Sequence, residues 1–173
     1  MRQIALCVLP AALAVTACMP QAATPEVLPQ KSAPPPSASP PRPAWAPLSE
    51  TRIISQVDAD RLLGNNGITL QWIGWDERGK VSVYPDKRGI WWLSSSQIGR
   101  QGARLLVEGR IVEIGEGYFT LDGVVSISNA PDAGRECRAD KTWHFAITRN
   151  RKYYRLREFE WCDGLTDYVD IYF

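Results

Sequence analysis

The stretch RLLVEGRIVEIGEGYFTLDGVVSIS, residues 104–128, contains two runs of alternating apolar and polar side chains separated by a glycine-rich turn. The apolar positions are Leu105, Val107 and Ile111 in the first run and Phe119, Leu121, Val125 and Ile127 in the second. A period of two is typical of half-buried strands, because successive side chains point to opposite faces of a sheet. The stretch therefore predicts an antiparallel hairpin that turns at residues 115–117. Gly123 indicates a bend or bulge in its second strand.

Further strands are predicted on both sides of this hairpin, because similar alternation recurs between turns rich in Gly, Asp and Pro. The segments are residues 68–72, 81–84 and 90–94 before the hairpin, and residues 143–148, 153–161 and 169–173 after it. Together with the hairpin they make about eight short strands. We therefore predict an all-β domain whose antiparallel sheet forms a closed or nearly closed barrel, since closure removes exposed strand edges.

The interior and one end of this barrel can also be outlined. An eight-stranded barrel with an aromatic-rich interior is either packed solid or holds one small ligand, and the sequence leaves both open. A short N-terminal helix precedes the first strand, with Ser55 or Asp58 as its N-cap and Gly64 at its end. This helix is short enough to plug one end. In outline the domain is similar to lipocalins and to the barrel lipoproteins that inhibit lysozyme, but it carries no motif of either family.

The beginning of the chain has the features of an export signal. Arg2 is the only charge before Glu26, and residues 4–17 form an apolar run that is shorter than the roughly 20 residues of a membrane-spanning helix. A charged start followed by a short apolar run is typical of a signal peptide. We therefore predict that residues 1–17 direct the protein out of the cytoplasm.

The signal peptide ends in Val15-Thr16-Ala17-Cys18, which resembles the lipobox of bacterial lipoproteins. The resemblance covers residues 1–18 only and implies cleavage before Cys18 and acylation of its thiol. Acyl chains would hold the protein on a membrane nearly permanently. Met19 stands where an aspartate would favour inner-membrane retention, so the outer membrane is the expected location.

A tether is predicted between the lipid and the domain. Of the 13 prolines, 10 fall between Pro20 and Pro47, in a segment with very few large apolar side chains. Such a chain cannot bury enough surface to fold, and it prefers extended polyproline II at about 3.1 Å per residue. We therefore expect residues 18–49 to be a disordered tether and residues 50–173 to form the β domain.

The charge balance excludes one class of partner. The chain has 20 basic and 19 acidic side chains, and the domain from residue 50 onward has 17 and 18. This balance argues against a polybasic protein that binds nucleic acid, as does export from the cytoplasm. We expect no nucleic-acid partner.

The domain retains two cysteines, Cys137 and Cys162. In an oxidising periplasm an even pair is expected to form a disulfide. Metal ligation is the alternative, but the clustered ligands of a zinc site are missing. We expect neither a metal nor a cofactor.

Catalysis is not indicated by any motif in the sequence. His144 is the only histidine, and alternation places it on the solvent side of its strand. The late carboxylates could form the acid pair of a glycoside hydrolase, although carboxylates are also common in turns and on outer strand faces. These carboxylates are Glu158, Glu160, Asp163, Asp167 and Asp170. A hydrolase that acts on cell-wall or carbohydrate substrates is therefore the alternative to a binding protein.

A candidate binding surface is predicted from basic and aromatic residues that interleave late in the chain, together with one tryptophan of the Trp91-Trp92 pair. Its members are Trp91, Arg151, Tyr153, Arg155 and Arg157. Exposed aromatic side chains are common interface anchors, and this basic patch suits anionic envelope material or an acidic protein. The leading hypothesis is an envelope lipoprotein whose non-enzymatic β domain binds a protein, glycan or small apolar ligand. A purely structural envelope module is a further alternative.

Overall fold

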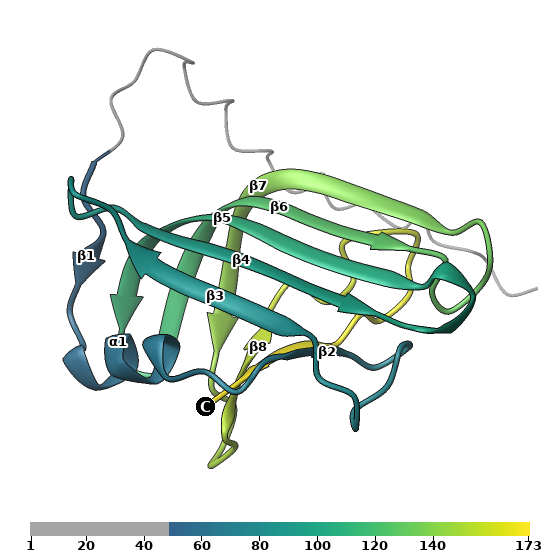
Figure 1. Ribbon diagram of the computed structural model, residues 1–173, viewed down its shortest axis with the longest axis horizontal. Coiled ribbons are helices and arrows are strands. Elements are labelled where there is room, and N and C mark those ends of the chain that lie inside the picture. The colour runs from purple at the N-terminus through teal and green to yellow at the C-terminus, as the bar shows by residue number, and fades with distance from the viewer. Residues whose placement is uncertain (1–48) are drawn as a thin grey trace, which may run out of the picture. The chain divides into compact units, whose positions relative to one another are not determined.

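The computed structural model describes residues 49–173 (Figure 1). The predicted signal peptide, the lipidation site at Cys18 and the tether up to residue 48 lie outside the described residues. No helix between residues 49 and 173 is both long and apolar enough to cross a bilayer.

The predicted all-β fold is confirmed. Residues 49–173 contain α1 (Gln56–Leu63), a 3₁₀ turn η1 (Arg100–Gly102) and the strands β1 (Arg52–Ile53), β2 (Ile68–Leu70), β3 (Lys80–Pro85), β4 (Trp91–Ile98), β5 (Arg104–Gly115), β6 (Tyr118–Ser128), β7 (Glu136–Ala146), β8 (Tyr153–Leu156) and β9 (Val169–Tyr172). Eight of the strands form one antiparallel sheet in the order β2-β9-β8-β7-β6-β5-β4-β3. The short β1 was not predicted, and it pairs in parallel with β5.

The sheet curls into a nearly closed barrel whose two outermost strands meet at one residue pair. Ile68 of β2 pairs with Gly79, the residue before β3. The Ile68 N–H donates to the Gly79 carbonyl at 3.1 Å, and the Gly79 N–H donates to the Ile68 carbonyl at 2.8 Å. We call this junction the seam.

The central hairpin consists of β5 and β6, as predicted, but its irregularity lies elsewhere. The register shifts between Ile111 and Glu113 in β5, not at Gly123 of β6. Gly123 faces Gly109, and a Cβ on Gly123 would lie 2.2 Å from the carbonyl oxygen of Glu108. Gly123 therefore marks a place where the two backbones approach too closely for a side chain.

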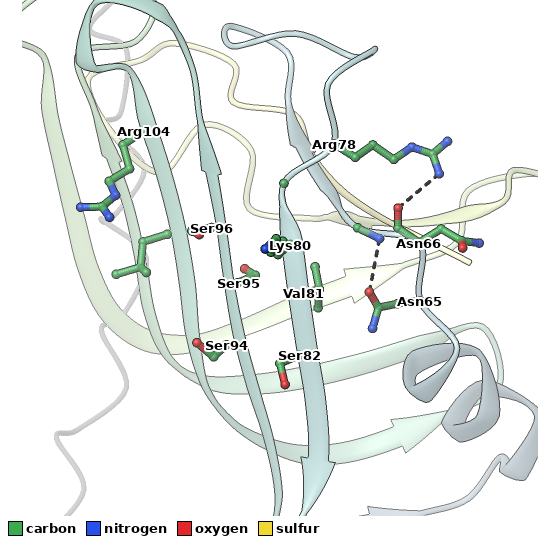
Figure 2. Close-up of a pocket in the computed structure, with 13 residues that line it drawn as sticks. Asn65, Asn66, Arg78, Lys80, Val81, Ser82, Ser94, Ser95, Ser96 and Arg104 are labelled. Carbon is green, nitrogen blue, oxygen red and sulfur yellow. Dashed lines mark hydrogen bonds between the residues drawn. The ribbon is translucent and has the colours of Figure 1, made fainter.

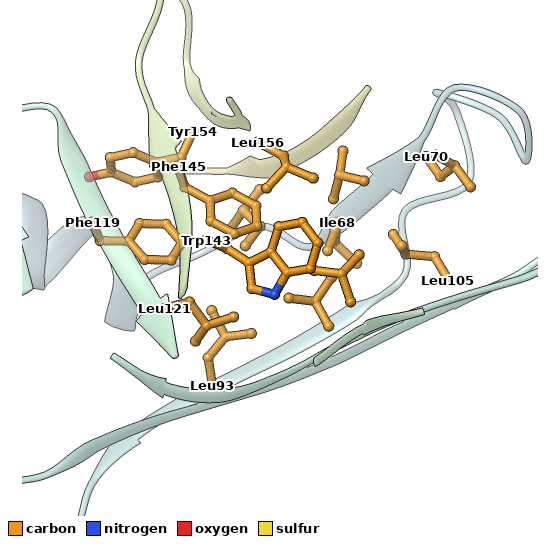
Figure 3. Close-up of a cluster of buried hydrophobic side chains, with 14 of the residues drawn as sticks. Ile68, Leu70, Leu93, Leu105, Phe119, Leu121, Trp143, Phe145, Tyr154 and Leu156 are labelled. Atoms are coloured by element: carbon orange, nitrogen blue, oxygen red, sulfur yellow. The ribbon is translucent and has the colours of Figure 1, made fainter. Parts of the chain in front are cut away.

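The barrel interior is filled by large side chains (Figure 3). Phe119 and Phe145 stack with their ring centroids 4.8 Å apart, and Tyr154 meets Phe119 edge to face. The fully buried Trp143 donates from Nε1 to the Gly123 carbonyl at 2.8 Å. Of the two possibilities that the sequence left open, the structure therefore favours a packed interior.

The predicted helix α1 is present and extends the packed core. Ser55 is its N-cap and Gly64 its C-cap, and Ala59 and Leu62 are fully buried. Asp58 is also buried, and it accepts hydrogen bonds at its carboxylate from Ser55 Oγ at 2.6 Å and Tyr154 Oη at 2.6 Å. This carboxylate therefore joins the helix to β8.

The segment predicted as a strand over residues 153–161 is shorter in the structure. β8 ends at Leu156, and one more bond, from the Arg157 N–H to the His144 carbonyl, follows the β7–β8 register before the chain runs on as a loop. Residues 157–168 form this loop, which the disulfide joins to the start of β7. We call it the bridging loop.

Candidate functional site

Trp91, predicted as part of a binding surface, is buried, so that prediction is wrong. Only 7% of Trp91 is exposed, and its backbone N–H donates to Thr51 Oγ1 at 2.8 Å. Along β4 the buried positions are Trp91, Leu93, Ser95 and Gln97. The strand therefore turns Trp91 towards the core and its neighbour Trp92 outwards.

The other four predicted residues lie on or beside β8. Tyr154 and Leu156 of this strand face the core, so Tyr153 and Arg155 point outwards. Arg151, just before the strand, and Arg157, just after it, are exposed. The structure thus brings Arg151, Tyr153 and Arg155 together, while Arg157 starts the bridging loop.

The structure adds residues from two other parts of the chain to this group. We define the aromatic–arginine surface as Trp75, Arg78, Arg151, Tyr153, Arg155, Tyr168 and Tyr172. Tyr153 and Tyr172 meet edge to face, with their ring centroids 5.4 Å apart. The guanidinium carbon of Arg78 lies 3.9 Å from the centroid of the Tyr172 ring. Guanidinium groups and aromatic rings therefore alternate across neighbouring elements.

Arg155 is at the centre of this surface. Its guanidinium carbon lies 4.1 Å from the Tyr168 ring centroid, 5.1 Å from that of Tyr153 and 6.0 Å from that of Trp75. Two of its nitrogens, Nε and Nη2, each donate to Asp170 at 2.7 Å. The Asp170 side chain is 1% exposed, whereas that of Arg155 is 16% exposed. Asp170 therefore fixes the orientation of Arg155 and leaves part of its face open to a ligand.

The electrostatics of this pair follow from burial and hydrogen bonding. Burial raises the pKa of Asp170, while the hydrogen bonds from Arg155 act in the opposite direction. The same hydrogen bonds raise the pKa of Arg155. Arg155 therefore remains a cation paired with Asp170, and its side chain is partly exposed on the outer surface of the barrel.

Trp75 and Arg78 belong to the loop between β2 and β3, which a buried glutamine holds in place. Gln97 is 1% exposed, and its Nε2 donates to the carbonyls of Gly74 at 3.0 Å and Glu77 at 2.7 Å. Its Oε1 accepts from the Leu70 N–H at 2.6 Å. A single core side chain on β4 thus positions the loop that supplies Trp75 to the surface.

The late carboxylates proposed for hydrolysis are occupied in other ways. Arg135 donates to Asp163 at 2.8 and 2.9 Å and to Asp167 at 3.0 and 2.9 Å. These bonds lower the pKa of Asp163. His144 is exposed and bonds to Glu158. Glu160 is exposed. The arrangement favours an ion-pair network over an acid–base pair.

The structure contains the predicted disulfide between Cys137 and Cys162. Their Cα atoms lie 6.1 Å apart, and the bond closes a loop with a sequence separation of 25. Such a bond contributes roughly 3 kcal/mol to stability. The two sulfur atoms also lie near Asp163. Because the sulfur atoms are bonded to each other, they do not provide the thiolates that a metal site would use.

The fold and this surface define a small antiparallel β-barrel domain with an aromatic and cationic outer face. The chain matches the model of the PM1083 family over residues 50–173. It is 33% identical over 116 residues to "Uncharacterized protein PM1083" of Pasteurella multocida (strain Pm70), an alignment that covers 66% of this chain and 74% of that protein. The chain therefore belongs to the PM1083 family. The comparison with solved structures gave no significant match.

Proposed function

We propose that the protein is an outer-membrane lipoprotein, anchored through acylated Cys18, whose β domain binds an anionic envelope glycan. The lipobox-like sequence supports the anchor, and the disulfide suits an oxidising compartment. The domain acts in the periplasm or at the cell surface, at the end of the predicted tether. Binding takes place on the aromatic–arginine surface and involves no catalysis.

The observation that carries the binding proposal is the arrangement around Arg155. A buried carboxylate fixes this guanidinium among three aromatic rings, so little side-chain freedom remains to be lost when a ligand binds. Guanidinium groups pair well with carboxylates and phosphates. The rings of Trp75 and Tyr168 offer flat apolar faces on which the C–H groups of a sugar ring can pack.

Two alternatives have less support. The filled barrel interior offers a small apolar ligand no obvious place inside the domain. A hydrolase would need two carboxylates free to exchange protons, whereas Asp163 and Asp167 share Arg135. Replacing both aspartates would leave Arg135 without either carboxylate. Loss of folding would then imitate loss of activity.

The anchor is tested by fractionating cells that express Cys18→Ala. We expect the wild-type protein to sediment with membranes and the variant to be released, because the thiol that receives the lipid is missing. The measurement is an immunoblot of membrane and soluble fractions, with a variant of the cysteine inside the leader, Cys7→Ala, as the control. Equal membrane retention of Cys18→Ala and the wild type would refute lipidation at this residue.

The binding proposal is tested with trigalacturonate, a short chain of carboxylated sugars, added to the full chain carrying Cys18→Ala. We expect titration by tryptophan fluorescence or calorimetry to show binding that weakens with salt, because charged groups take part. Trp75→Ala should weaken binding about tenfold, since truncation of an aromatic anchor typically costs more than 1 kcal/mol.

The control variant is Tyr84→Ala. Tyr84 is 51% exposed, comparable to Trp75 at 43%, but it lies on β3 outside the aromatic–arginine surface. Its replacement should leave the affinity unchanged. Maltotriose, a neutral trisaccharide, should bind much more weakly than trigalacturonate. If trigalacturonate fails to bind, or if Trp75→Ala binds it as tightly as the parent chain, the proposal is wrong.

A further inference from the structure

A groove with a volume of about 690 Å³, lined mainly by Asn, Ser, Arg and Lys residues, crosses the outer side of the barrel beside the seam. Figure 2 shows it running over β3 and β4, with Arg78 and Arg104 at opposite ends. Its lining reaches Leu106 on β5, so the groove spans three neighbouring strands, or about 10 Å at the usual strand spacing. We call it the serine groove because three outward-facing serines form its floor.

These serines come from adjacent strands in register. Ser82 of β3 lies opposite Ser94 of β4, and Ser96 lies opposite Lys80. The hydroxyls of Ser82, Ser94 and Ser96 form no side-chain hydrogen bond with any residue in the described part of the chain. A hydroxyl can both donate and accept, so the floor offers a ligand several free hydrogen-bonding groups.

The charged residues that line the serine groove are all cations, namely Arg78, Lys80 and Arg104. The exposed Glu108 lies opposite Ser94 in register but outside this lining. Neither Lys80 nor Arg104 forms an ion pair within residues 49–173. Arg78 also lies over the ring of Tyr172, so it belongs both to this groove and to the aromatic–arginine surface. The two regions therefore adjoin at one guanidinium.

We propose that the serine groove is a second ligand site, and that one extended anionic polysaccharide occupies it together with the aromatic–arginine surface. The polysaccharide crosses the seam at Arg78. This inference rests on the proposed function and adds to it that the ligand is a polymer rather than a short glycan. Several units bind on the aromatic side, and the following units lie across Ser82 and Ser94.

The composition of the groove favours a glycan over a protein partner. Protein–protein interfaces are enriched in aromatic residues and depleted in Ser and Lys, and their centres are apolar. The serine groove has no aromatic residue in its lining, and its floor carries hydroxyls. Sugar hydroxyls match these groups, and sugar carboxylates or phosphates match the flanking cations. The aromatic–arginine surface then provides the stacking that the serine groove lacks.

The experiment compares trigalacturonate with polygalacturonate on the full chain carrying Cys18→Ala, with concentrations expressed per sugar unit. Because the two regions adjoin, we expect the polymer to bind about tenfold more tightly or better. Ser94→Glu places a negative charge on the exposed floor of the groove. It should remove the gain for polygalacturonate and leave the affinity for trigalacturonate unchanged.

Thr142→Glu is the matched control, since Thr142 is an exposed residue on β7 that does not line the groove. It adds the same charge and should change neither affinity. Circular dichroism of each variant verifies folding. Lys80→Ala, which introduces no new charge, should likewise weaken only the binding of the polymer.

The outcomes separate this inference from the proposed function. If both probes bind equally per sugar unit, or if Ser94→Glu weakens both alike, the second site is overturned while the aromatic–arginine surface stands. If neither probe binds, both proposals fail. If polyglutamate, an acidic polypeptide, binds as tightly as polygalacturonate and is weakened by the same variants, recognition depends on charge alone, and the assignment to a glycan is overturned.

Discussion

Arg135→Ala is expected to lower the free energy of unfolding by about 3–5 kcal/mol, the usual cost of removing one partner of a buried ion pair. The Arg135 side chain is 6% exposed and that of Asp167 is fully buried. Without the guanidinium, the buried Asp167 carboxylate has no ion-pair partner and keeps one side-chain hydrogen bond, from Trp72 Nε1 at 2.9 Å. The carbonyl of Ala130 also loses its bond to Arg135.

Urea unfolding followed by tryptophan fluorescence measures this loss. The control is Arg52→Ala, because Arg52 pairs with Glu113 but its side chain is 74% exposed. Exposed pairs contribute about 0–1 kcal/mol, so this variant should unfold nearly as the wild type does. A loss below about 1 kcal/mol for Arg135→Ala would mean that the network does not hold the bridging loop in place.

The second large effect is expected for Asp58→Ala, which should lower the free energy of unfolding by about 3 kcal/mol at neutral pH. The reason is that the buried Tyr154 hydroxyl and the Gly117 N–H lose their acceptor. Burial raises the pKa of Asp58, but hydrogen bonds from Ser55, Tyr154, Gly117 and Arg61 outweigh burial and hold it below its usual value. The folded state therefore binds a proton at Asp58 less readily than the unfolded state does.

The pH dependence follows from that difference. The stabilisation by the ionised carboxylate is complete above the unfolded-state pKa of about 4 and is lost as the pH falls through the folded-state pKa. The stability difference between the wild type and Asp58→Ala should therefore narrow below about pH 4. Urea unfolding at several pH values measures it, with Asp60→Asn, on an exposed position of the same helix, as the control. A difference that stays constant down to pH 2 would contradict the role assigned to Asp58.

The fold was predictable to a large extent because most strands carry a clear period of two. The main apolar positions of β6, and those of β5 up to its register shift after Ile111, recur at odd-numbered residues, since these positions face the core. The helix was predictable from its caps, Ser55 and Gly64. The length of β8 was not, because Phe159 and Trp161 alternate with acidic residues as in a strand, while the disulfide and Arg135 hold the chain in a loop.

Other elements have no local signal. The first half of β7 has exposed polar side chains at residues 140–142, so the sequence there indicates a loop, yet its backbone pairs fully with β6. β1 has two residues, too few for a periodic pattern. Glutamine is a residue type usually found at the surface, and only the loop that Gln97 supports explains why this side chain is buried.

The candidate site was predictable only in part. Arg151, Tyr153 and Arg155 are close in sequence, so their grouping was evident. Tyr168 and Tyr172 could have been added, because alternation about Val169 and Ile171 places them outside. Trp75 and Arg78 come from a distant loop, and no sequence spacing indicates that they meet Arg155 and Tyr172. Trp91 was misplaced because either member of the Trp91-Trp92 pair satisfies the pattern.

The seam has a consequence for local motion. The other neighbouring strands of the sheet are joined by ladders of at least two residue pairs. At the seam the barrel is closed by the single pair Ile68 and Gly79, with two hydrogen bonds. Partial unfolding that spares the core therefore has its easiest starting point there, next to Arg78. A polymer bound across the seam would contact the strands on both sides of it and stabilise the closed barrel. Opening of the seam would then become less frequent as more polymer binds.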